Sequence, residues 1–267
     1  MTTPVPQRSP DPLVTTSYTD HVLTLTLNRP ARLNPLSEEM LVALQEALDA
    51  AATTPEVRVV ILAAAGKAFC AGHDLREMRG ISEQEAHQEL FDRCGRMMQT
   101  VTAMPKPVIA QVQGLATAAG CQLVAACDLA VASTQARFAV SGINVGLFCS
   151  TPAVPLSRNL SRKRALEMLL TGDFIDAATA EEWGLINRVA DSDTLEAETR
   201  ALAQKIATKT PLSIQLGKQM FYRQLELPLG EAYAFASERM ACNMDSEDAR
   251  EGIDAFLEKR PPRWQGR

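Results

Sequence analysis

Apolar residues alternate with threonine over residues 22–27, a pattern typical of a β-strand with one buried face. The turn Asn28-Arg29-Pro30 ends this strand. A helix is predicted next, because Ser37 is a suitable N-cap and apolar residues then recur every four positions until Pro55. The nearly continuous apolar run of residues 57–63 predicts a strand that is buried on both faces.

The same order of helix and strand is repeated further along the chain. A charged helical stretch at residues 82–102 precedes a predicted strand at 108–112. A Gly- and Ala-rich helix start is predicted at 115–120, and another short strand at 129–132. This rhythm indicates an α/β fold with a mostly parallel sheet covered by helices.

From Ser161 onward the strand pattern nearly disappears and helices dominate. They are predicted at residues 162–170, 177–183, 192–209, 211–225, 229–243 and 246–258. Their predicted caps are Ser161, Asp176, Ser192, Thr210 and Asp245. This region is too apolar for a solvated tail, so we expect it to pack on the sheet or on another subunit.

We divide the chain into three parts on this basis. Residues 1–18 are rich in proline and predict a flexible leader, residues 19–200 form the α/β core, and residues 201–267 form a helical region. A chain of 267 residues with 46% hydrophobic and 22% charged residues is long and apolar enough for a buried core. This composition excludes a disordered chain.

Charge and composition narrow the class of protein further. A net charge of −5 argues against nucleic acid as the main partner. The sequence contains no apolar run of roughly 18 residues, so we expect no membrane span. The six cysteines form no C-x-x-C pair and only three histidines occur, so neither a disulfide framework nor a metal site is expected. A reducing cytoplasm is the expected location.

Two segments of small residues follow predicted buried strands, at 69–75 and 114–123. Small side chains let a ligand approach the backbone, and the first amides of a helix have no partner within it. Two such N–H groups that point at one place would make an oxyanion hole. The alternative is that these glycines and alanines only allow tight packing between strand and helix.

Motifs along nearly the whole chain beyond the leader support a catalytic interpretation. They are Asn28-Arg29-Pro30 with Leu33-Asn34, F-C-A-G-H-D-L at 69–75, K-P-V-I-A at 106–110, G-C-Q-L at 120–123, C-D-L at 127–129, L-T-G at 170–172, A-x-x-W-G-L-I-N at 180–187 and the segment 245–260. Together they resemble the crotonase (enoyl-CoA hydratase/isomerase) superfamily. The resemblance implies a crotonase-like spiral of ββα turns, a C-terminal helical trimerisation region, and a homotrimer or a dimer of trimers.

The resemblance also implies roles for particular residues. The backbone amides of His73 and Ala119 would hold the thioester oxygen of an acyl-CoA substrate. The coenzyme A part would lie against Ala31, Arg32 and Leu33 and the segment Ala71, His73, Asp74 and Leu75, and Lys259 of a neighbouring subunit would approach its phosphates. Coenzyme A enters as part of the substrate, so no separate cofactor and no metal are expected.

The sequence departs from the family pattern where hydratases carry two glutamates. Gln122 and Gly142 occupy those positions, and Ser150 stands where related dienoyl isomerases carry an acid. An amide does not exchange protons near neutral pH and glycine has no side chain, so ordinary hydration is doubtful. The expected substitutes are acids of the stretch 76–92, namely Glu77, Glu83, Glu85, Glu89 and Asp92.

Three other functions stay open at this point. The segment A-G-H-D-L is similar to the methylmalonyl-CoA decarboxylase branch, although that branch has a tyrosine where this chain has Cys149. A non-catalytic acyl-CoA-binding protein would keep the scaffold without the chemistry. RNA binding is the third, and the acidic charge argues against it.

Several side chains have both a functional and a structural interpretation. His73 either meets the substrate or pairs with Asp74, and Cys149 is either a nucleophile or a small buried residue. The basic residues Arg158, Arg162, Lys163 and Arg164 either meet phosphate or form a solvated helix start, and Lys259-Arg260 either meet the coenzyme or complement a helix end.

Overall fold

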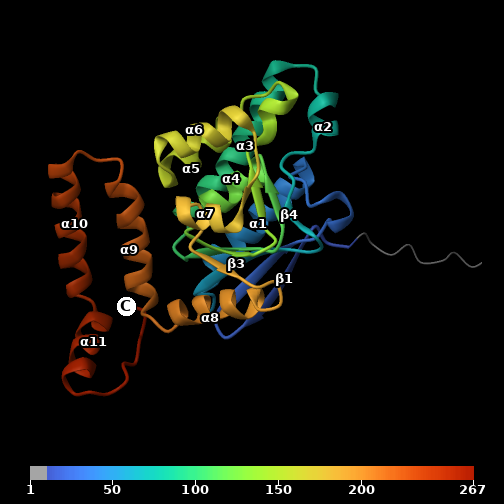
Figure 1. Cartoon of the computed structure of the whole chain (residues 1–267). Helices are drawn as coiled ribbons and strands as arrows, with labels where there is room; N and C mark the ends of the chain where they lie inside the picture. The colour runs from blue at the N-terminus through green and yellow to red at the C-terminus, as the bar shows by residue number, and fades with distance from the viewer. Residues whose placement is uncertain (1–10) are drawn as a thin grey trace, which may run out of the picture.

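The computed structural model describes residues 11–267 and shows an α/β body with a separate group of C-terminal helices (Figure 1). Within these residues the strands form two sheets. The larger sheet contains, in spatial order, β1 (Val14–Thr19), β2 (Val22–Leu27), β3 (Val59–Ala64), β5 (Val108–Val112), β7 (Leu129–Ser133) and β10 (Arg188–Ala190). The smaller sheet contains β4 (Ala68–Cys70), β6 (Leu115–Thr117), β8 (Arg137–Ala139) and β9 (Ile175–Asp176).

Consecutive strands alternate between the two sheets. β3, β5 and β7 lie in the larger sheet, and the strand that follows each of them, β4, β6 and β8, lies in the smaller one. Pairing is parallel except between β1 and β2 and between β8 and β9. This arrangement confirms the predicted spiral of ββα turns.

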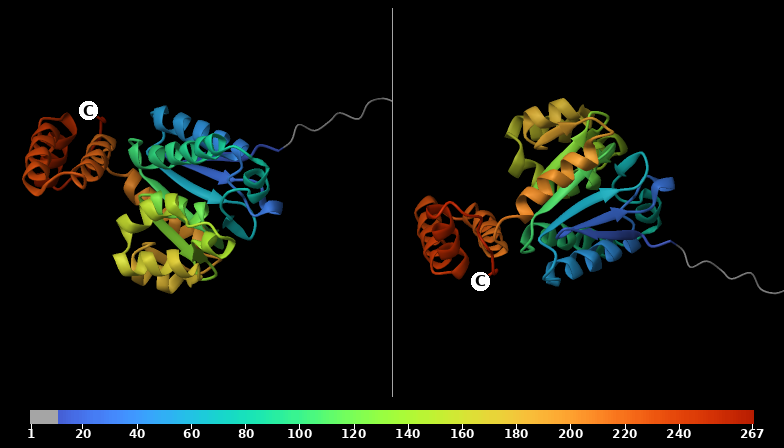
Figure 2. Two further views of the ribbon diagram at one scale, coloured as in Figure 1. Left: turned by 90° about the horizontal axis from the view of Figure 1, so that it is seen from above. Right: turned by 90° about the horizontal axis from the view of Figure 1, so that it is seen from below.

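Helices cover both faces of the larger sheet (Figure 2). Their bounds are α1 (Glu38–Thr53), α2 (Leu75–Gly80), α3 (Gln84–Ala103), α4 (Ala119–Ala126), α5 (Ser150–Asn159), α6 (Arg162–Thr171), α7 (Ala177–Trp183), α8 (Leu195–Ala207), α9 (Pro211–Gln224), α10 (Leu229–Met244) and α11 (Glu247–Leu257). Two short 3-10 helices, η1 (Pro30–Arg32) and η2 (Ser141–Val145), lie in the loops. Among the helices of residues 11–267, none combines the length and the apolar character needed to cross a bilayer.

The start of α1 follows the predicted local chemistry. The Ser37 side chain accepts a hydrogen bond of 3.2 Å from the Met40 backbone N–H, which satisfies one free donor of the first turn. Met40, Leu44 and Leu48 are fully buried against the core. The four-residue spacing therefore identified both the helix and its buried face.

The prediction of a helix start at residues 115–120 was wrong in its first half. Leu115–Thr117 form β6, which pairs in parallel with β4 and β8, and α4 begins only at Ala119. Three residues carry no periodic pattern, so only pairing with neighbouring strands reveals this strand.

The expected leader also needs correction. Residues 14–18 belong to β1, which pairs antiparallel with β2 over six residues of each strand. Residues 1–10 of the expected leader lie outside the described residues. The prolines of this part of the chain led to the prediction of an irregular leader, so the strand that follows them was not recognised.

Two helices were not predicted, α2 and α5, and two caps were misplaced. α5 contains Pro152 and Pro155, residues that normally argue against a helix interior. The predicted cap Ser192 instead shares a 2.7 Å hydrogen bond with Ser133, and α8 begins three residues later. Ser246, not Asp245, caps α11 and accepts from the Ala249 N–H.

Helices α9, α10 and α11 stand beside the α/β body in each view of Figures 1 and 2. The chain end folds back onto this group, because the Trp264 indole N–H donates to the Thr208 carbonyl at 2.8 Å. The buried Asp248 carboxylate accepts from the backbone N–H groups of Gln265 and Gly266 at 2.6 and 2.9 Å. The final residues therefore belong to the helical group.

A buried ion pair joins this group to the body. Lys218 of α9 donates to Asp128 at 2.7 Å, and also to the carbonyls of Val101 at 2.8 Å and Lys106 at 2.9 Å. The Asp128 carboxylate accepts from the Tyr222 hydroxyl at 2.8 Å and from the Val108 N–H at 2.7 Å. Burial raises the pKa of Asp128 and lowers that of Lys218, while the attraction of each partner opposes both shifts.

We expect Lys218→Met to lower the free energy of unfolding by about 3 to 5 kcal/mol, because it leaves the Asp128 charge buried without its cation. The two side chains are only 6% and 14% exposed. Urea unfolding at one fixed protein concentration measures the change, and Lys209→Met on the exposed surface is the matched control. The double variant Lys218→Met/Asp128→Asn should recover part of the loss. A loss equal to that of the control would contradict this account of the pair.

Candidate functional site

The two glycine-containing segments meet where β4 and β6 end. Gly72 follows β4 with φ +92°, and a Cβ placed on it would lie 3.1 Å from the Thr117 oxygen and 3.4 Å from the Ala119 nitrogen. A Cβ on Gly120 would lie 2.2 Å from the Cys70 oxygen. Both glycines are therefore required for the close approach of the two segments.

The backbone N–H groups of His73 and Ala119 lie on these adjacent segments. In the part of the chain that the structure describes, neither of them donates a hydrogen bond. His73 forms an isolated parallel bridge with Leu36, in which the Leu36 N–H donates to the Gly72 carbonyl at 2.8 Å. Ala119 is the first residue of α4, where helix geometry leaves the N–H free.

Ala118 is held in an unfavourable backbone conformation between these segments. Its φ of 49° and ψ of −118° lie in a region that favours glycine, and its N–H donates to the Ala139 carbonyl at 2.9 Å. Such strain often accumulates at functional sites. Sequence analysis missed this residue because alanine gives no signal for a positive φ.

Polar side chains fix the loops around the two segments. Asn34, which is fully buried, donates to the Ala65 and Ala68 carbonyls at 2.9 Å each, and accepts from the Arg29 N–H. The Thr117 hydroxyl donates to the Ala71 carbonyl at 2.9 Å. Asn34 has φ 51°, and the tolerance of asparagine for that region was the one signal that could have identified it.

The residues expected to contact coenzyme A come together on one side of these loops. Ala31 and Arg32 lie in η1, and the Leu33 carbonyl accepts from the Ala71 N–H at 3.0 Å. Arg32 lies 3.9 Å from Asp74 across the two loops. Asp74 caps α2 by accepting from the Arg76 N–H at 2.9 Å.

Two further expected contact residues differ in their placement. Leu75 is the first residue of α2 and is 56% exposed. Lys259 follows α11 in the C-terminal group, which stands apart from α2 in Figure 1. One chain by itself therefore does not bring Lys259 to the loops.

His73 and Gln122 each bury a polar atom without a partner. Among the described residues, Nε2 of His73 and Oε1 of Gln122 have no hydrogen-bond partner. The His73 ring contacts Phe91 edge to face, with centroids 5.6 Å apart, and does not pair with Asp74. Desolvation lowers the pKa of His73 from 6.5 to about 4, so the ring is neutral at pH 7.

The position of the second family glutamate has no room for a side chain. A Cβ on Gly142 would lie 2.6 Å from the Leu147 oxygen and 2.7 Å from Cys149 Sγ. Burial raises the pKa of Cys149, which favours a small buried residue over a nucleophile. Ser150 is exposed at the start of α5, where its hydroxyl donates to the Phe148 carbonyl.

Comparison with known proteins agrees with this arrangement. The family model described as Enoyl-CoA hydratase/isomerase matches residues 18–267. The chain belongs to the enoyl-CoA hydratase/isomerase family. The resemblance found in the sequence motifs is thereby confirmed.

Individual relatives of this family match over nearly the whole chain. The mitochondrial enoyl-CoA hydratase domain-containing protein 3 of Rattus norvegicus is 45% identical over 252 residues, which cover 94% of this chain and 84% of the relative. The 2,3-dehydroadipyl-CoA hydratase of Escherichia coli is 36% identical, covering 94% and 98%. A crystal structure of enoyl-CoA hydratase from Mycobacterium smegmatis has a TM-score of 0.93 and 55% identity, covering 95% and 99%.

These relatives correct one expectation from the sequence. The domain-containing protein 3 relatives from rat, mouse, frog and human are all named as mitochondrial, which contradicts the expected cytoplasmic location. The spacing of cysteines indicates only whether a compartment is reducing or oxidising. It therefore cannot distinguish the cytoplasm from another reducing compartment.

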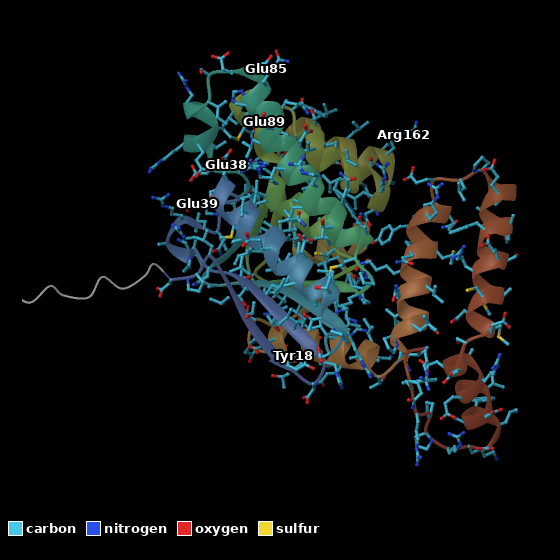
Figure 3. All side chains as sticks on the ribbon, turned by 180° about the vertical axis from the view of Figure 1, so that it is seen from behind. Tyr18, Glu38, Glu39, Glu85, Glu89 and Arg162 are labelled. Atoms are coloured by element: carbon cyan, nitrogen blue, oxygen red, sulfur yellow. The ribbon has the colours of Figure 1, made fainter. Side chains whose placement is uncertain are left out.

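The acids expected to replace the family glutamates lie on the surface of the body. The side chains of all five are exposed, namely Glu77, Glu83, Glu85, Glu89 and Asp92. Figure 3 shows Glu85 and Glu89 at the outer end of the body, far from Tyr18. Glu77 accepts from the Glu38 N–H at 3.0 Å and so fixes the start of α1.

The basic side chains at residues 158–164 are partly engaged with carboxylates on the surface. Arg164 lies 3.0 Å from Glu182 and stacks over Trp183, and Arg158 lies 3.6 Å from Glu226. Arg260 makes a bidentate pair with Glu251 at 2.7 and 2.9 Å. These pairs favour the structural interpretation of Arg158, Arg164 and Arg260.

The described residues contain no arrangement of side chains suited to a metal centre. Across residues 11–267, no group of three or more His, Cys, Asp or Glu side chains is arranged to hold an ion. Cys121 and Cys127 are buried in the core, and burial raises the pKa of the Cys121 thiol to about 12.

The depressed pKa of His73 predicts a pH-dependent stability. The unfolded chain binds a proton near pH 6.5, whereas the folded ring stays neutral to about 4, so stability that is complete above pH 6.5 falls with pH through this window. When the pH is lowered from about 7 to about 4.5, the free energy of unfolding of the wild-type protein should fall by about 2.5 kcal/mol more than that of His73→Phe. Urea unfolding at both values measures this, and equal losses in the two proteins would refute the buried neutral ring.

Proposed function

We propose that this protein acts on an acyl-CoA thioester by polarising its carbonyl with the backbone N–H groups of His73 and Ala119. The observation that supports it is the close approach of the Gly72 and Ala119 backbones at the ends of two parallel strands. Among the described residues, the backbone N–H groups of His73 and Ala119 on these segments donate no hydrogen bond. Family membership supports acyl-CoA as the substrate class.

Fixed backbone donors suit a thioester enolate. The negative charge that develops on the carbonyl oxygen needs donors that are already oriented, and each one is worth about 3 kcal/mol of transition-state stabilisation. The segments are held by Asn34, Thr117 and two glycines, so little reorganisation is needed when charge develops. Ala31, Arg32 and Leu33 would border the coenzyme A part next to Ala71 and Asp74.

Ordinary hydration is not part of this proposal. Gln122 cannot transfer a proton, Gly142 lacks both a side chain and the space for one, and Ser150 faces outward. The decarboxylase alternative receives less support, because Cys149 stands where that branch has a tyrosine. A non-catalytic acyl-CoA-binding protein is the second candidate, favoured by the filled space at Gly142.

The carbonyl-binding role can be tested with a matched pair of ligands. We expect butyryl-CoA to bind at least tenfold more tightly than S-butyl-CoA, a thioether that lacks only the carbonyl oxygen. Isothermal titration calorimetry gives both dissociation constants. Equal affinity for the two ligands would exclude the proposed oxyanion hole.

Turnover distinguishes the enzyme from the binding protein. Hydration of crotonyl-CoA should be at least a hundredfold slower than in a hydratase with both glutamates. Gln122→Glu/Gly142→Glu should not restore it, because a side chain at residue 142 collides with the Leu147 backbone. Mass spectrometry of the protein incubated with malonyl-type, methylmalonyl-type and 2-enoyl thioesters distinguishes the two candidates. An enzyme consumes at least one of these thioesters, and a binding protein consumes none.

We also propose that the chain works as a homotrimer or a dimer of trimers, with Lys259 of a neighbour near the coenzyme phosphates. The C-terminal helices expose many large apolar side chains, among them Leu229 at 76%, Tyr233 at 69% and Phe256 at 81%. Exposed apolar surface of this extent favours association. Residues 229, 233 and 240 lie on one stripe of α10.

Light scattering should therefore give a mass three or six times the 29.0 kDa of one chain. Tyr233→Glu/Met240→Glu should lower this mass, since it places two charges on the stripe. Glu238→Gln on the same helix is the matched control and should leave the mass unchanged. A monomeric wild-type protein would refute the proposed assembly.

A further inference from the structure

Two polar atoms that use none of their hydrogen-bonding capacity lie beside the proposed thioester site. Gln122 is only 3% exposed, and its Oε1 atom is buried. Nε2 of His73 is also buried. Within residues 11–267 neither atom has a partner. Because an unpaired buried polar atom is costly, two of them on the two segments that meet at Gly72 and Ala119 call for an explanation in terms of a ligand.

The backbone places both residues at the same end of α4. His73 directly follows Gly72, whose backbone approaches the Ala119 nitrogen. Gln122 is three residues into α4, and helical side chains lean back toward the N-terminus of their helix. Phe91 of α3 packs on the His73 ring, and α3 packs against α4.

We propose that His73 and Gln122 form a subsite for a neutral hydroxyl group on the acyl chain, and that this subsite disfavours both plain alkyl chains and carboxylates. The inference rests on the proposed acyl-CoA function, because it needs the thioester to lie against the start of α4. It assigns to Gln122 a role in selecting the acyl group, in place of proton transfer.

The hydrogen-bonding chemistry of the two side chains favours a hydroxyl. A neutral imidazole can donate from Nε2, and a carboxamide oxygen only accepts. A hydroxyl can accept from the first and donate to the second, so it satisfies both atoms at once. A carboxylate only accepts, so it could pair with the imidazole N–H but would leave the Gln122 oxygen unpaired, while an alkyl chain would leave both atoms unpaired.

Binding of a ligand series tests the subsite. The probes are the 2-, 3- and 4-hydroxybutyryl thioesters of coenzyme A, compared with butyryl-CoA and succinyl-CoA by isothermal titration calorimetry. We expect at least one hydroxy isomer to bind wild type about tenfold more tightly than butyryl-CoA, and succinyl-CoA to bind more weakly than that isomer.

Two variants locate the preference. Gln122→Met removes the acceptor and His73→Phe removes the ring nitrogen, while the backbone N–H of residue 73 remains in both. Each should reduce the hydroxyl preference, measured as the ratio of the butyryl-CoA to the hydroxybutyryl-CoA dissociation constant in the same protein, to less than about threefold. The control Gln99→Met makes the same change on the exposed surface of α3 and should keep the full preference.

The outcomes separate this inference from the proposed function. If all hydroxy isomers bind like butyryl-CoA, or if the preference survives in both variants, the subsite is refuted while acyl-CoA binding stands. A preference for succinyl-CoA also refutes it and favours a decarboxylase. If wild type binds none of the thioesters, the proposed function itself fails.

Discussion

The approach of two backbone segments at the ends of β4 and β6 is the constraint on which the site depends. Parallel neighbouring strands end at the same edge of their sheet, so the turns that follow them must share a small space. Gly72 and Gly120 make this possible, because a Cβ at either position would press on the opposite backbone. The strained conformation of Ala118 is the local cost of the same packing.

The two helices behind the site are held at their far ends by the C-terminal region. Lys218 donates to the Val101 carbonyl in the last turn of α3 and to Asp128, two residues beyond the end of α4. α3 carries Phe91 against His73, and α4 carries Ala119 and Gln122. The C-terminal helices therefore stabilise the frame of the site although they lie outside it.

The side chains of the candidate site differ from those of the family's hydratases, while its proposed donors belong to the backbone. Polarising a carbonyl, as proposed for His73 and Ala119, needs only N–H groups, which every non-proline residue supplies, so it does not depend on the two family glutamates. The space at Gly142 is filled by Leu147 and Cys149, and Gln122 presents an amide that cannot transfer a proton. Binding and carbonyl polarisation can thus persist where the acid–base chemistry of the family is absent.

By itself, the sequence determined the α/β class, the longer helices and the two segments of the site. Periodic burial identified α1 and the C-terminal helices, and the small residues after the strands at 57–63 and 108–112 marked the segments. It did not reveal β4, β6 or α5, because strands of three residues have no period and prolines oppose a helix signal. Only the tertiary structure decided that His73 lies unpaired and neutral, that Gly142 has no free space, and that Lys218 reaches Asp128. These depend on contacts between residues far apart in the chain, which local patterns do not encode.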